Sequence, residues 1–123
     1  MTENCIFCDI AARRVPAEVV AEAGNVLAFR DTNPAAPSHV LMIPKMHIAD
    51  SAADLDGSHN AILGELFAMA ARVARIEALD DGWRLVSNIG PAAGQTVLHL
   101  HFHILGGWDD SRTASALNEE TGG

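Results

Sequence analysis

Apolar and polar positions follow two different periods along this chain, and each period predicts a different element. In residues 97–107, VLHLHFHILGG, apolar side chains occupy every second position up to Ile104, which is the period of a β-strand. Between residues 62 and 76 they recur at alternating spacings of four and three, which is the period of an amphipathic helix. That helical stripe consists of Ile62, Leu66, Met69, Val73 and Ile76, widened by Leu63, Phe67 and Ala70. It predicts one long helix packed on a sheet or on a partner.

Shorter apolar runs, separated by proline and glycine, predict the remaining elements. A short helix is expected in FCDIAARRVP, where Pro16 stops it. Four further strands, the first two joined in a hairpin about Gly24-Asn25, are expected over residues 19–21, 26–30, 39–43 and 83–88. Together with the alternating stretch, the pattern predicts an α+β fold: a five-stranded antiparallel sheet with one long and one short helix.

Size and charge narrow the classes of function. The chain has 123 residues, which suits one compact domain. Its net charge is −8 and its eight lysines and arginines are scattered, so no basic block can follow a nucleic-acid backbone. No apolar run reaches the roughly 18 residues of a membrane span, and the first residues lack a signal pattern. We therefore expect a cytoplasmic protein that binds no nucleic-acid polymer and no membrane. A small phosphate ester needs a site built from amides, hydroxyls and imidazoles.

Three of the six histidines lie in the alternating stretch, at positions 99, 101 and 103. Residues two apart diverge by about 200° around a helix but share one face of a strand, so His99, His101 and His103 are predicted to form a row. The intervening Leu98, Leu100, Phe102 and Ile104 are predicted to form the buried face. The row is about 13 Å long, too long for all three imidazoles to bind one ion. The three histidines must therefore have different roles.

The two cysteines form the motif Cys5-x-x-Cys8. In a reducing cytosol a structural disulfide is disfavoured, which leaves a metal site or a redox pair. A redox motif of this spacing usually follows a strand and begins a helix, whereas only four residues precede Cys5. The sequence therefore favours a metal site.

The row His-φ-His-φ-His-φ-φ, where φ is apolar, resembles the signature of the histidine triad (HIT) family. HLHFHIL, followed by Gly-Gly, matches it at every position. LAFRDTNPAAPSHVLMIPKMHI and SNIGPAAGQTVLHLHFHILGG look like the corresponding segments of the Hint branch, so the resemblance covers roughly residues 4–107. We expect a HIT domain over 1–107 and a polar tail over 108–123, which lacks the Trp-Pro-Pro-Gly type of ending found in some Hint proteins.

The resemblance implies an enzyme that hydrolyses or transfers nucleotides at the α-phosphate, through a nucleotidyl-histidine intermediate. By position His101 is the nucleophile, His103 lies beside the phosphate as a hydrogen-bond donor or acid, and His39 lines the same pocket. Asp31 would accept hydrogen bonds from the ribose. The residues expected to contact the phosphate or its leaving group are Asn88, Gln95 and Thr96. Those expected to enclose the base are Ile6, Phe7, Ile10, Phe29 and Leu41.

Similarity to the related nucleotidyl transferases of hexose metabolism implies a structural zinc ion. Its ligands would be Cys5, Cys8, His47 and His99. The family also implies a homodimer, consistent with the apolar helix. The remaining histidine, His59, is expected to be a solvated surface residue.

Several alternatives stay open at this point. The substrate class could be purine nucleoside phosphoramidates or dinucleoside polyphosphates, or the chain could be a nucleotide-binding zinc protein with little turnover. Without the resemblance, the apolar residues of the proposed base site would be assigned to the core, Asp31 to a turn, and His39 to a strand edge. The alternative for the cysteines is a pair of buried thiols without metal.

Overall fold

The structure, a computed structural model, describes residues 5–109. Its helices and strands in chain order are α1 (Ile6–Ala11), β1 (Val19–Ala23), β2 (Val26–Arg30), β3 (Ser38–Pro44), α2 (Asn60–Ile76), β4 (Trp83–Val86) and β5 (Phe102–Gly106). Single 3-10 turns lie in the connections at Ala52–Asp54, Gly57–His59 and Pro91–Ala93. Most of the predicted tail, from residue 110 on, lies outside the described residues.

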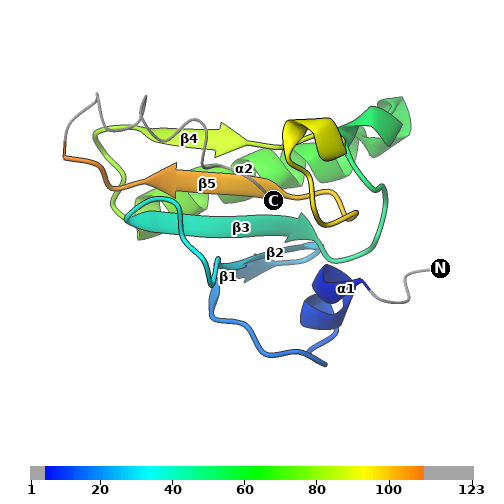
Figure 1. Cartoon of the computed structure of the whole chain (residues 1–123), viewed down its shortest axis with the longest axis horizontal. Helices are drawn as coiled ribbons and strands as arrows, with labels where there is room; N and C mark the ends of the chain where they lie inside the picture. The colour runs from blue at the N-terminus through cyan, green and yellow to red at the C-terminus, as the bar shows by residue number, and fades with distance from the viewer. Residues whose placement is uncertain (1–4, 110–123) are drawn as a thin grey trace.

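The five strands form one antiparallel sheet in the order β1-β2-β3-β5-β4 (Figure 1). The hairpin β1–β2 turns at Gly24, whose φ of +42° suits glycine. The central pair β3–β5 aligns Leu41 with His103 and Met42 with Phe102. The predicted α+β fold, with five antiparallel strands, one long helix and one short helix, is confirmed.

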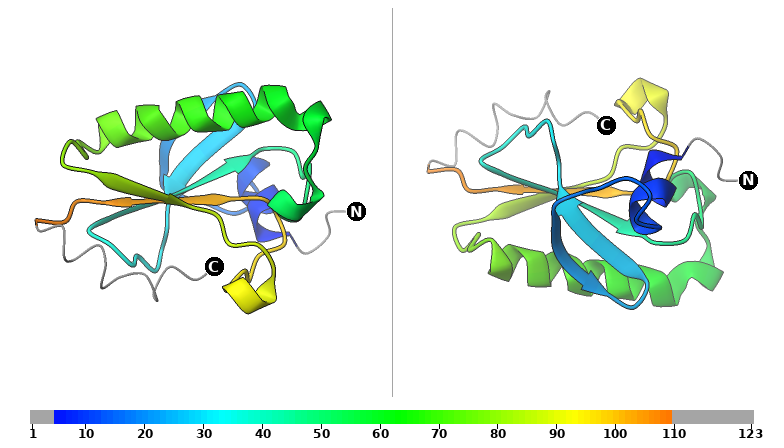
Figure 2. Two further views of the ribbon diagram at one scale, coloured as in Figure 1. Left: turned by 90° about the horizontal axis from the view of Figure 1, so that it is seen from above. Right: turned by 90° about the horizontal axis from the view of Figure 1, so that it is seen from below.

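Alternation along β2, β3 and β5 divides the core between the two faces of the sheet. Residues such as Ala28, Met42 and Ile104 pack against α2, which runs along one face (Figure 2). The positions between them face the other way, where Leu27, Phe29, Leu41 and Ile43 pack against Phe7 and Ile10 of α1. Because His39 and His103 share the parity of Leu41 and its neighbours, they also lie on the α1 side.

The last strand is shorter than its apolar alternation predicts, because β5 begins at Phe102 and not near residue 97. Before Phe102 the backbone forms hydrogen bonds outside the sheet. The Ser87 hydroxyl donates to the His101 carbonyl, and the Leu100 amide donates to the Ala49 carbonyl in a loop. Leu98 is accordingly 57% exposed, so its predicted burial is wrong. Likewise β4 ends at Val86, two residues earlier than expected.

The long helix buries only part of its apolar stripe. Leu66, Met69 and Val73 are buried against the sheet, whereas Phe67 is 55% exposed and Ile76 is also exposed. His59 is half-buried rather than solvated, because its Nδ1 accepts the Asp56 amide in the turn before α2. Among residues 5–109, no helix is both long and apolar enough to cross a membrane.

Candidate active site and metal-ligand cluster

A cavity of about 540 Å³ lies on the α1 side of the sheet. It is bounded by α1, by β2 and β3, and by the segment that leads from residue 94 into β5. Of the twelve residues predicted from the sequence to act on or bind a nucleotide, all but Asn88 and Gln95 line it. The ten that line it are Ile6, Phe7, Ile10, Phe29, Asp31, His39, Leu41, Thr96, His101 and His103.

The apolar wall of the cavity comes from α1 and the strands beneath it. The ring of Phe7 meets Phe29 edge-on at a centroid distance of 5.7 Å and His101 at 5.0 Å. Cys5 caps α1, since its Sγ accepts the Cys8 amide at 3.2 Å. The short helix therefore presents an aromatic side chain directly against the central histidine of the row.

His101 is held by the backbone just before it. Its Nδ1 lies 2.7 Å from the His99 carbonyl oxygen, which can only accept, so Nδ1 carries the proton. The lone pair of the neutral ring is therefore on Nε2. The ring lines the cavity, where it stands 5.2 Å from the ring of His103.

His103 and His39 form a buried pair on adjacent strands. His39 Nε2 and His103 Nδ1 are 2.9 Å apart, and the Ala35 amide donates to His39 Nδ1 at 2.9 Å. Burial, together with the neighbouring His101 and His39, lowers the pKa of His103 to about 4. Burial also lowers the pKa of His39, against the opposing effect of Asp31. Both imidazoles are therefore neutral at pH 7.

Asp31 follows β2 at the rim of the cavity. Its Oδ1 accepts the Asn33 amide at 2.8 Å, which is the turn role anticipated as an alternative. Its Oδ2 lies 3.4 Å from His39 Nε2. One carboxylate thus shapes the turn and also lies beside the histidine pair, so the turn role and a binding role are compatible.

Gln95 is 6% exposed and its carboxamide is occupied inside the protein. Its Nε2 donates to the carbonyls of Asp50, at 2.7 Å, and Val97, at 3.0 Å, while its Oε1 accepts the Gly90 amide at 2.8 Å. The side chain therefore braces the loop and does not face the cavity. Thr96, the next residue, does line it.

Some lining residues were missed by reasoning from the sequence. Pro16, Ala17 and Val97 complete the apolar wall, and Arg30 and Asn33 lie at the polar rim. The first three belong to no recognisable motif. They are apolar residues in connecting segments, and only the packing of the folded chain shows that they line the cavity. Asn33 could have been suspected from its position two residues after Asp31.

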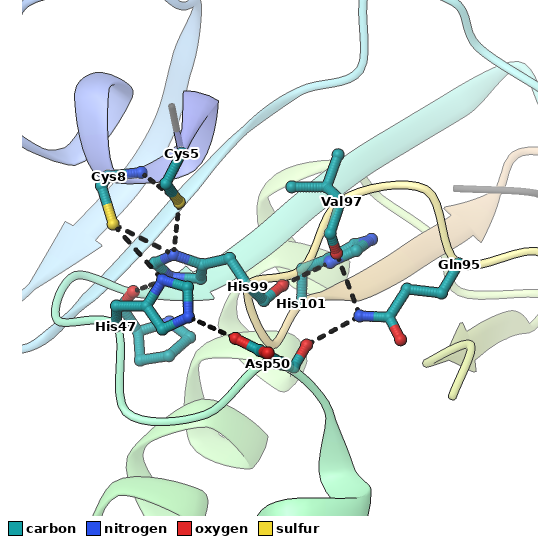
Figure 3. Close-up of polar contacts among 9 residues, drawn as sticks. Cys5, Cys8, His47, Asp50, Gln95, Val97, His99 and His101 are labelled. Carbon is teal, nitrogen blue, oxygen red and sulfur yellow. Dashed lines mark hydrogen bonds and ion pairs between the residues drawn. The ribbon is translucent and has the colours of Figure 1, made fainter. Parts of the chain in front are cut away.

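A second group of side chains, the metal-ligand cluster, lies beside the cavity and consists of Cys5, Cys8, His47 and His99 (Figure 3). The Sγ of Cys5 is 3.2 Å from His99 Nδ1, and the Sγ of Cys8 is 3.5 Å from the same atom and 3.6 Å from His47 Nδ1. One ligand atom from each residue lies within 4.8 Å of all the others. The structure thus brings together the four residues predicted as zinc ligands.

The far side of each imidazole in the cluster faces an oxygen atom. His99 Nε2 donates to the Pro44 carbonyl at 2.9 Å, and His47 Nε2 donates to Asp50 Oδ1 at 2.7 Å (Figure 3). Both Nδ1 atoms therefore direct lone pairs at the thiols. Burial lowers the pKa of His99 to about 4, so this ring is neutral as a metal ligand must be. Two thiols and two such imidazoles are the ligand set of a closed structural zinc site.

Comparison with known proteins gives a consistent result. The HIT domain family matches residues 12–110. The 14 kDa zinc-binding protein of Zea mays is 47% identical over 103 residues, 83% of this chain and 80% of that protein. The purine nucleoside phosphoramidase of Escherichia coli (strain K12) is 40% identical over 108 residues, 87% of this chain and 90% of that protein. A solved HIT family hydrolase from Clostridium thermocellum has a TM-score of 0.84 at 45% identity, covering 89% of this chain and 95% of that one.

Proposed function

We propose that this chain, which belongs to the HIT domain family, is a nucleotide hydrolase or transferase acting at the α-phosphate of purine nucleoside phosphoramidates or related nucleotide conjugates. The observation that carries the proposal is the orientation of His101. Its Nδ1 is tied to a carbonyl at 2.7 Å, so Nε2 holds the lone pair of a ring that lines a cavity of about 540 Å³. An oriented neutral imidazole is a competent nucleophile at neutral pH.

The reaction proceeds in two displacements. First, the lone pair of His101 Nε2 forms a bond to the α-phosphorus, and the bond from phosphorus to the leaving atom breaks. The leaving group takes that electron pair and a proton. Water then attacks the phosphorus, the bond to Nε2 breaks, and its electron pair returns to His101. Overall one water is consumed: its oxygen and one hydrogen stay with the nucleotide and its other hydrogen balances the proton taken by the leaving group. Hydrogen bonding from Nδ1 to the His99 carbonyl stabilises the cationic phosphorylated ring.

The rest of the cavity suits the remainder of a nucleotide. Phe7, Phe29 and Leu41 offer an apolar wall for a purine, and Asp31 offers carboxylate oxygens for ribose hydroxyls. At the phosphate end, Thr96 offers a hydroxyl and His103 an imidazole. A site built from neutral donors is required here, because the chain carries a net charge of −8 and its overall field repels anions.

Zinc is proposed as a structural ion held by Cys5, Cys8, His47 and His99. When bound, the ion would cross-link the start of α1 to the segment before β5. It would thereby hold Phe7 and Ile10 of α1 over the cavity. Thiolate ligands need a reducing compartment, in keeping with the cytoplasmic location expected from the sequence.

The relatives support both parts of the proposal. The Escherichia coli relative is named for phosphoramidase activity on purine nucleosides, and the maize relative is named for zinc binding. The present chain combines the cavity with the cluster, and the two share the segment from His99 to His101. A nucleotide enzyme with a supporting metal is therefore the function that these observations favour.

The decisive experiment is to trap the intermediate. A radiolabelled adenosine phosphoramidate is mixed with the protein, quenched in acid, and the labelled peptide is mapped. We expect one labelled residue, His101. Label on another residue would refute the assigned nucleophile, and turnover without any trapped label would count against the covalent route.

Two further measurements separate the alternatives. Comparing kcat/KM for adenosine phosphoramidate and diadenosine polyphosphate distinguishes the two hydrolase classes, and we expect the phosphoramidate to be preferred. His101→Asn should lower turnover by at least about 10⁴-fold while AMP still binds. If wild type and His101→Asn bind AMP equally and neither turns over, the chain is a binding protein.

A homodimer is proposed on the basis of exposed apolar side chains. Phe67 of α2 contacts Phe102 at a ring distance of 5.9 Å yet stays 55% exposed, and Trp83 lies on the edge strand β4. A second copy of the chain would cover such residues and the open edge of the sheet. Light scattering should give twice the mass of the chain, and Phe67→Glu should shift it toward the monomer.

A further inference from the structure

Glu77 directly follows α2 and carries a carboxylate that faces the sheet. Its side chain is only 10% exposed, and both of its oxygens accept hydrogen bonds from residues of the sheet. Arg30 donates to Oε1 at 2.7 Å and to Oε2 at 2.8 Å, and the Ser38 hydroxyl donates to Oε1 at 2.9 Å. The hydrogen bonds from Arg30 lower the pKa of Glu77, so the carboxylate is ionised at pH 7. Bidentate pairs of this kind are strong and fix the geometry of both partners.

The two residues that Glu77 holds lie at the ends of neighbouring strands. Arg30 is the last residue of β2 and Ser38 is the first residue of β3, so residues 31–37 between them form a loop. Some of these loop residues line the cavity, namely Asp31, Thr32 and Asn33. One carboxylate therefore holds both ends of a loop that forms part of the cavity wall.

Glu77 reaches this loop from the face of the sheet opposite to the cavity. Arg30 and Ser38 point to the α2 face, where they meet Glu77 at the end of the helix. Because neighbouring side chains of an extended chain point to opposite faces, the residue after each, Asp31 and His39, lies on the cavity side. The Asp31 amide donates to the His39 carbonyl at 3.0 Å, which joins the two ends of the loop. A displacement of Arg30 or Ser38 therefore moves the backbone that carries Asp31.

The chain around Glu77 is itself firmly packed. After Glu77 the chain turns, and the Leu79 amide donates to the Ala74 carbonyl at 2.9 Å, which closes the end of α2. Leu79 is buried over Gly106 of β5, where an added Cβ atom would lie 2.9 Å from the Leu79 side chain. Gly106 pairs with Ser38 in the sheet. The Glu77 carboxylate is therefore attached to a helix end that packs closely against the same part of the sheet.

We propose that Glu77 is a positioning residue for the ribose of the substrate: by holding Arg30 and Ser38, it fixes the loop that directs the Asp31 carboxylate into the cavity. The ribose part of this inference rests on the proposed function, whereas the control of the loop does not. Asp31 Oδ1 accepts the Asn33 amide at 2.8 Å, so the conformation of the loop also sets the direction of the carboxylate. Glu77 touches no substrate, so its substitution should change substrate affinity more than the rate of the chemical step.

Glu18 provides a matched control. It pairs with the same guanidinium, since Arg30 Nε donates to Glu18 Oε2 at 3.1 Å. Its side chain is 74% exposed, and exposed ion pairs contribute little. Glu18→Gln therefore removes one carboxylate charge beside Arg30 and leaves the bonds from Arg30 and Ser38 to Glu77 in place.

Hydrogen exchange in the full-length protein tests the control of the loop without any ligand. The amides of Asp31 and Asn33 are hydrogen-bonded at 3.0 and 2.8 Å, so their exchange reports opening of the loop. Relative to amides in the centre of the sheet, we expect Glu77→Ala to speed their exchange by at least about tenfold and Glu18→Gln by less than about twofold. If Glu77→Ala does not fold, Glu77→Gln keeps the shape of the side chain and should show the same change at a smaller size. Unchanged exchange in a folded Glu77 variant would refute the proposal.

The ribose hydroxyls allow the second part to be tested. AMP and 2′,3′-dideoxy-AMP differ only in the two hydroxyls that Asp31 would bind. By calorimetry, wild type and Glu18→Gln should prefer AMP by at least about tenfold, and Glu77→Gln by about threefold. A general loss of stability would weaken both nucleotides and leave their ratio unchanged. With adenosine phosphoramidate, Glu77→Gln should raise KM while kcat stays within about twofold of wild type.

The possible results separate this inference from the proposed function. If wild type prefers AMP and both Glu77 variants keep the full preference, Glu77 does not position the ribose contact. If wild type binds the two nucleotides equally, Asp31 does not bind the ribose, and the ribose part of the inference is wrong. If AMP does not bind at all, the proposed function fails, while the exchange rates still decide whether Glu77 controls the loop.

Discussion

The metal-ligand cluster and the group of Asp31, His39 and His103 look equivalent by distance, since each brings its ligand atoms within 4.8 Å. They differ in what faces the outer nitrogen of each ring. In the cluster, His47 and His99 donate outward to oxygen atoms, so their lone pairs point inward at the thiols. In the other group the outer nitrogen of His39 accepts a backbone amide, so a proton points inward.

This difference shows that proximity alone does not define a metal site. An imidazole binds a cation through a lone pair and an anion through a proton, and the hydrogen bond on its far side selects between them. We therefore propose that one protein uses the same side chain for a cation site and for an anion site close beside it. The following predictions test this comparison, from the largest expected effect to the smallest.

Removing both thiols should abolish the cation site alone. The wild type should contain about one zinc per chain, and Cys5→Ser with Cys8→Ser should contain none. If free zinc is present at roughly a hundred times its Kd, loss of zinc binding lowers the free energy of unfolding by about 3 kcal/mol. Elemental analysis and urea unfolding measure the two effects, while the His103 tautomer should stay as it is. Wild type purified without chelator and found free of zinc would contradict the assignment.

Gln95 connects the two regions, because it bonds to Asp50 beside the cluster and to the loop beside the cavity. Gln95→Met leaves three partly buried backbone groups without this partner, and we expect a loss of about 2 kcal/mol of stability. If Gln95 instead contacts the phosphate, as the resemblance implied, the variant would raise KM with little change in the melting temperature. Thermal unfolding and steady-state kinetics on the same sample distinguish these results.

Acid should weaken the fold through His103. Its pKa is about 4 in the folded chain and about 6.5 when unfolded, so below pH 6.5 the unfolded chain binds a proton that the folded chain does not. Stability is therefore lost as the pH falls from about 6.5 toward 4, by about 2 kcal/mol between pH 7.5 and 5 from this group. His103→Gln should show a correspondingly smaller loss over this range in urea unfolding. Equal losses in the two proteins would mean that His103 is not buried as a neutral ring.

The Asp50 carboxylate, which accepts a hydrogen bond from His47 Nε2, should have a smaller effect on zinc affinity. Asp50→Asn keeps an oxygen that can accept from His47 Nε2 but removes the charge, so zinc affinity should fall by about tenfold. Asp54→Asn removes the same charge nearby, in a 3-10 turn, and serves as the matched control. Competition with a chromogenic chelator measures both. A similar loss in the two variants would indicate a general charge effect and no specific role for Asp50.

The fold was predictable because its signals are local. Alternation predicted the last strand, short apolar runs between proline and glycine residues predicted the other four, and the spacing of Leu66, Met69 and Val73 predicted α2. The limits of β5 were not predictable, since the alternation continues back to Leu98, whereas Ser87 and Ala49, from other parts of the chain, bond the backbone of residues 101 and 100. A periodic pattern indicates which side chains face the core. It does not indicate where the neighbouring strand ends, and that decides where β5 begins.

The candidate site was predictable to a similar extent. The histidine row and the cysteine pair stand out by residue type and spacing, and the resemblance added Asp31 and the apolar wall. Gln95 was predicted to contact the phosphate, but a carboxamide next to Thr96 suits either a ligand contact or a loop brace. Only packing shows that its amide is already occupied by three backbone groups.

By itself, the sequence determined the α+β fold and identified the side chains that the structure brings together in the metal-ligand cluster and around the cavity. The tertiary structure decided the proton positions of His39, His99, His101 and His103. A side chain's face on a strand follows from the residues next to it, whereas the tautomer of a neutral imidazole follows from whatever donor or acceptor the fold brings to its other nitrogen. Those partners are mostly backbone groups, the Ala35 amide and the carbonyls of Pro44 and His99, which no residue type can reveal.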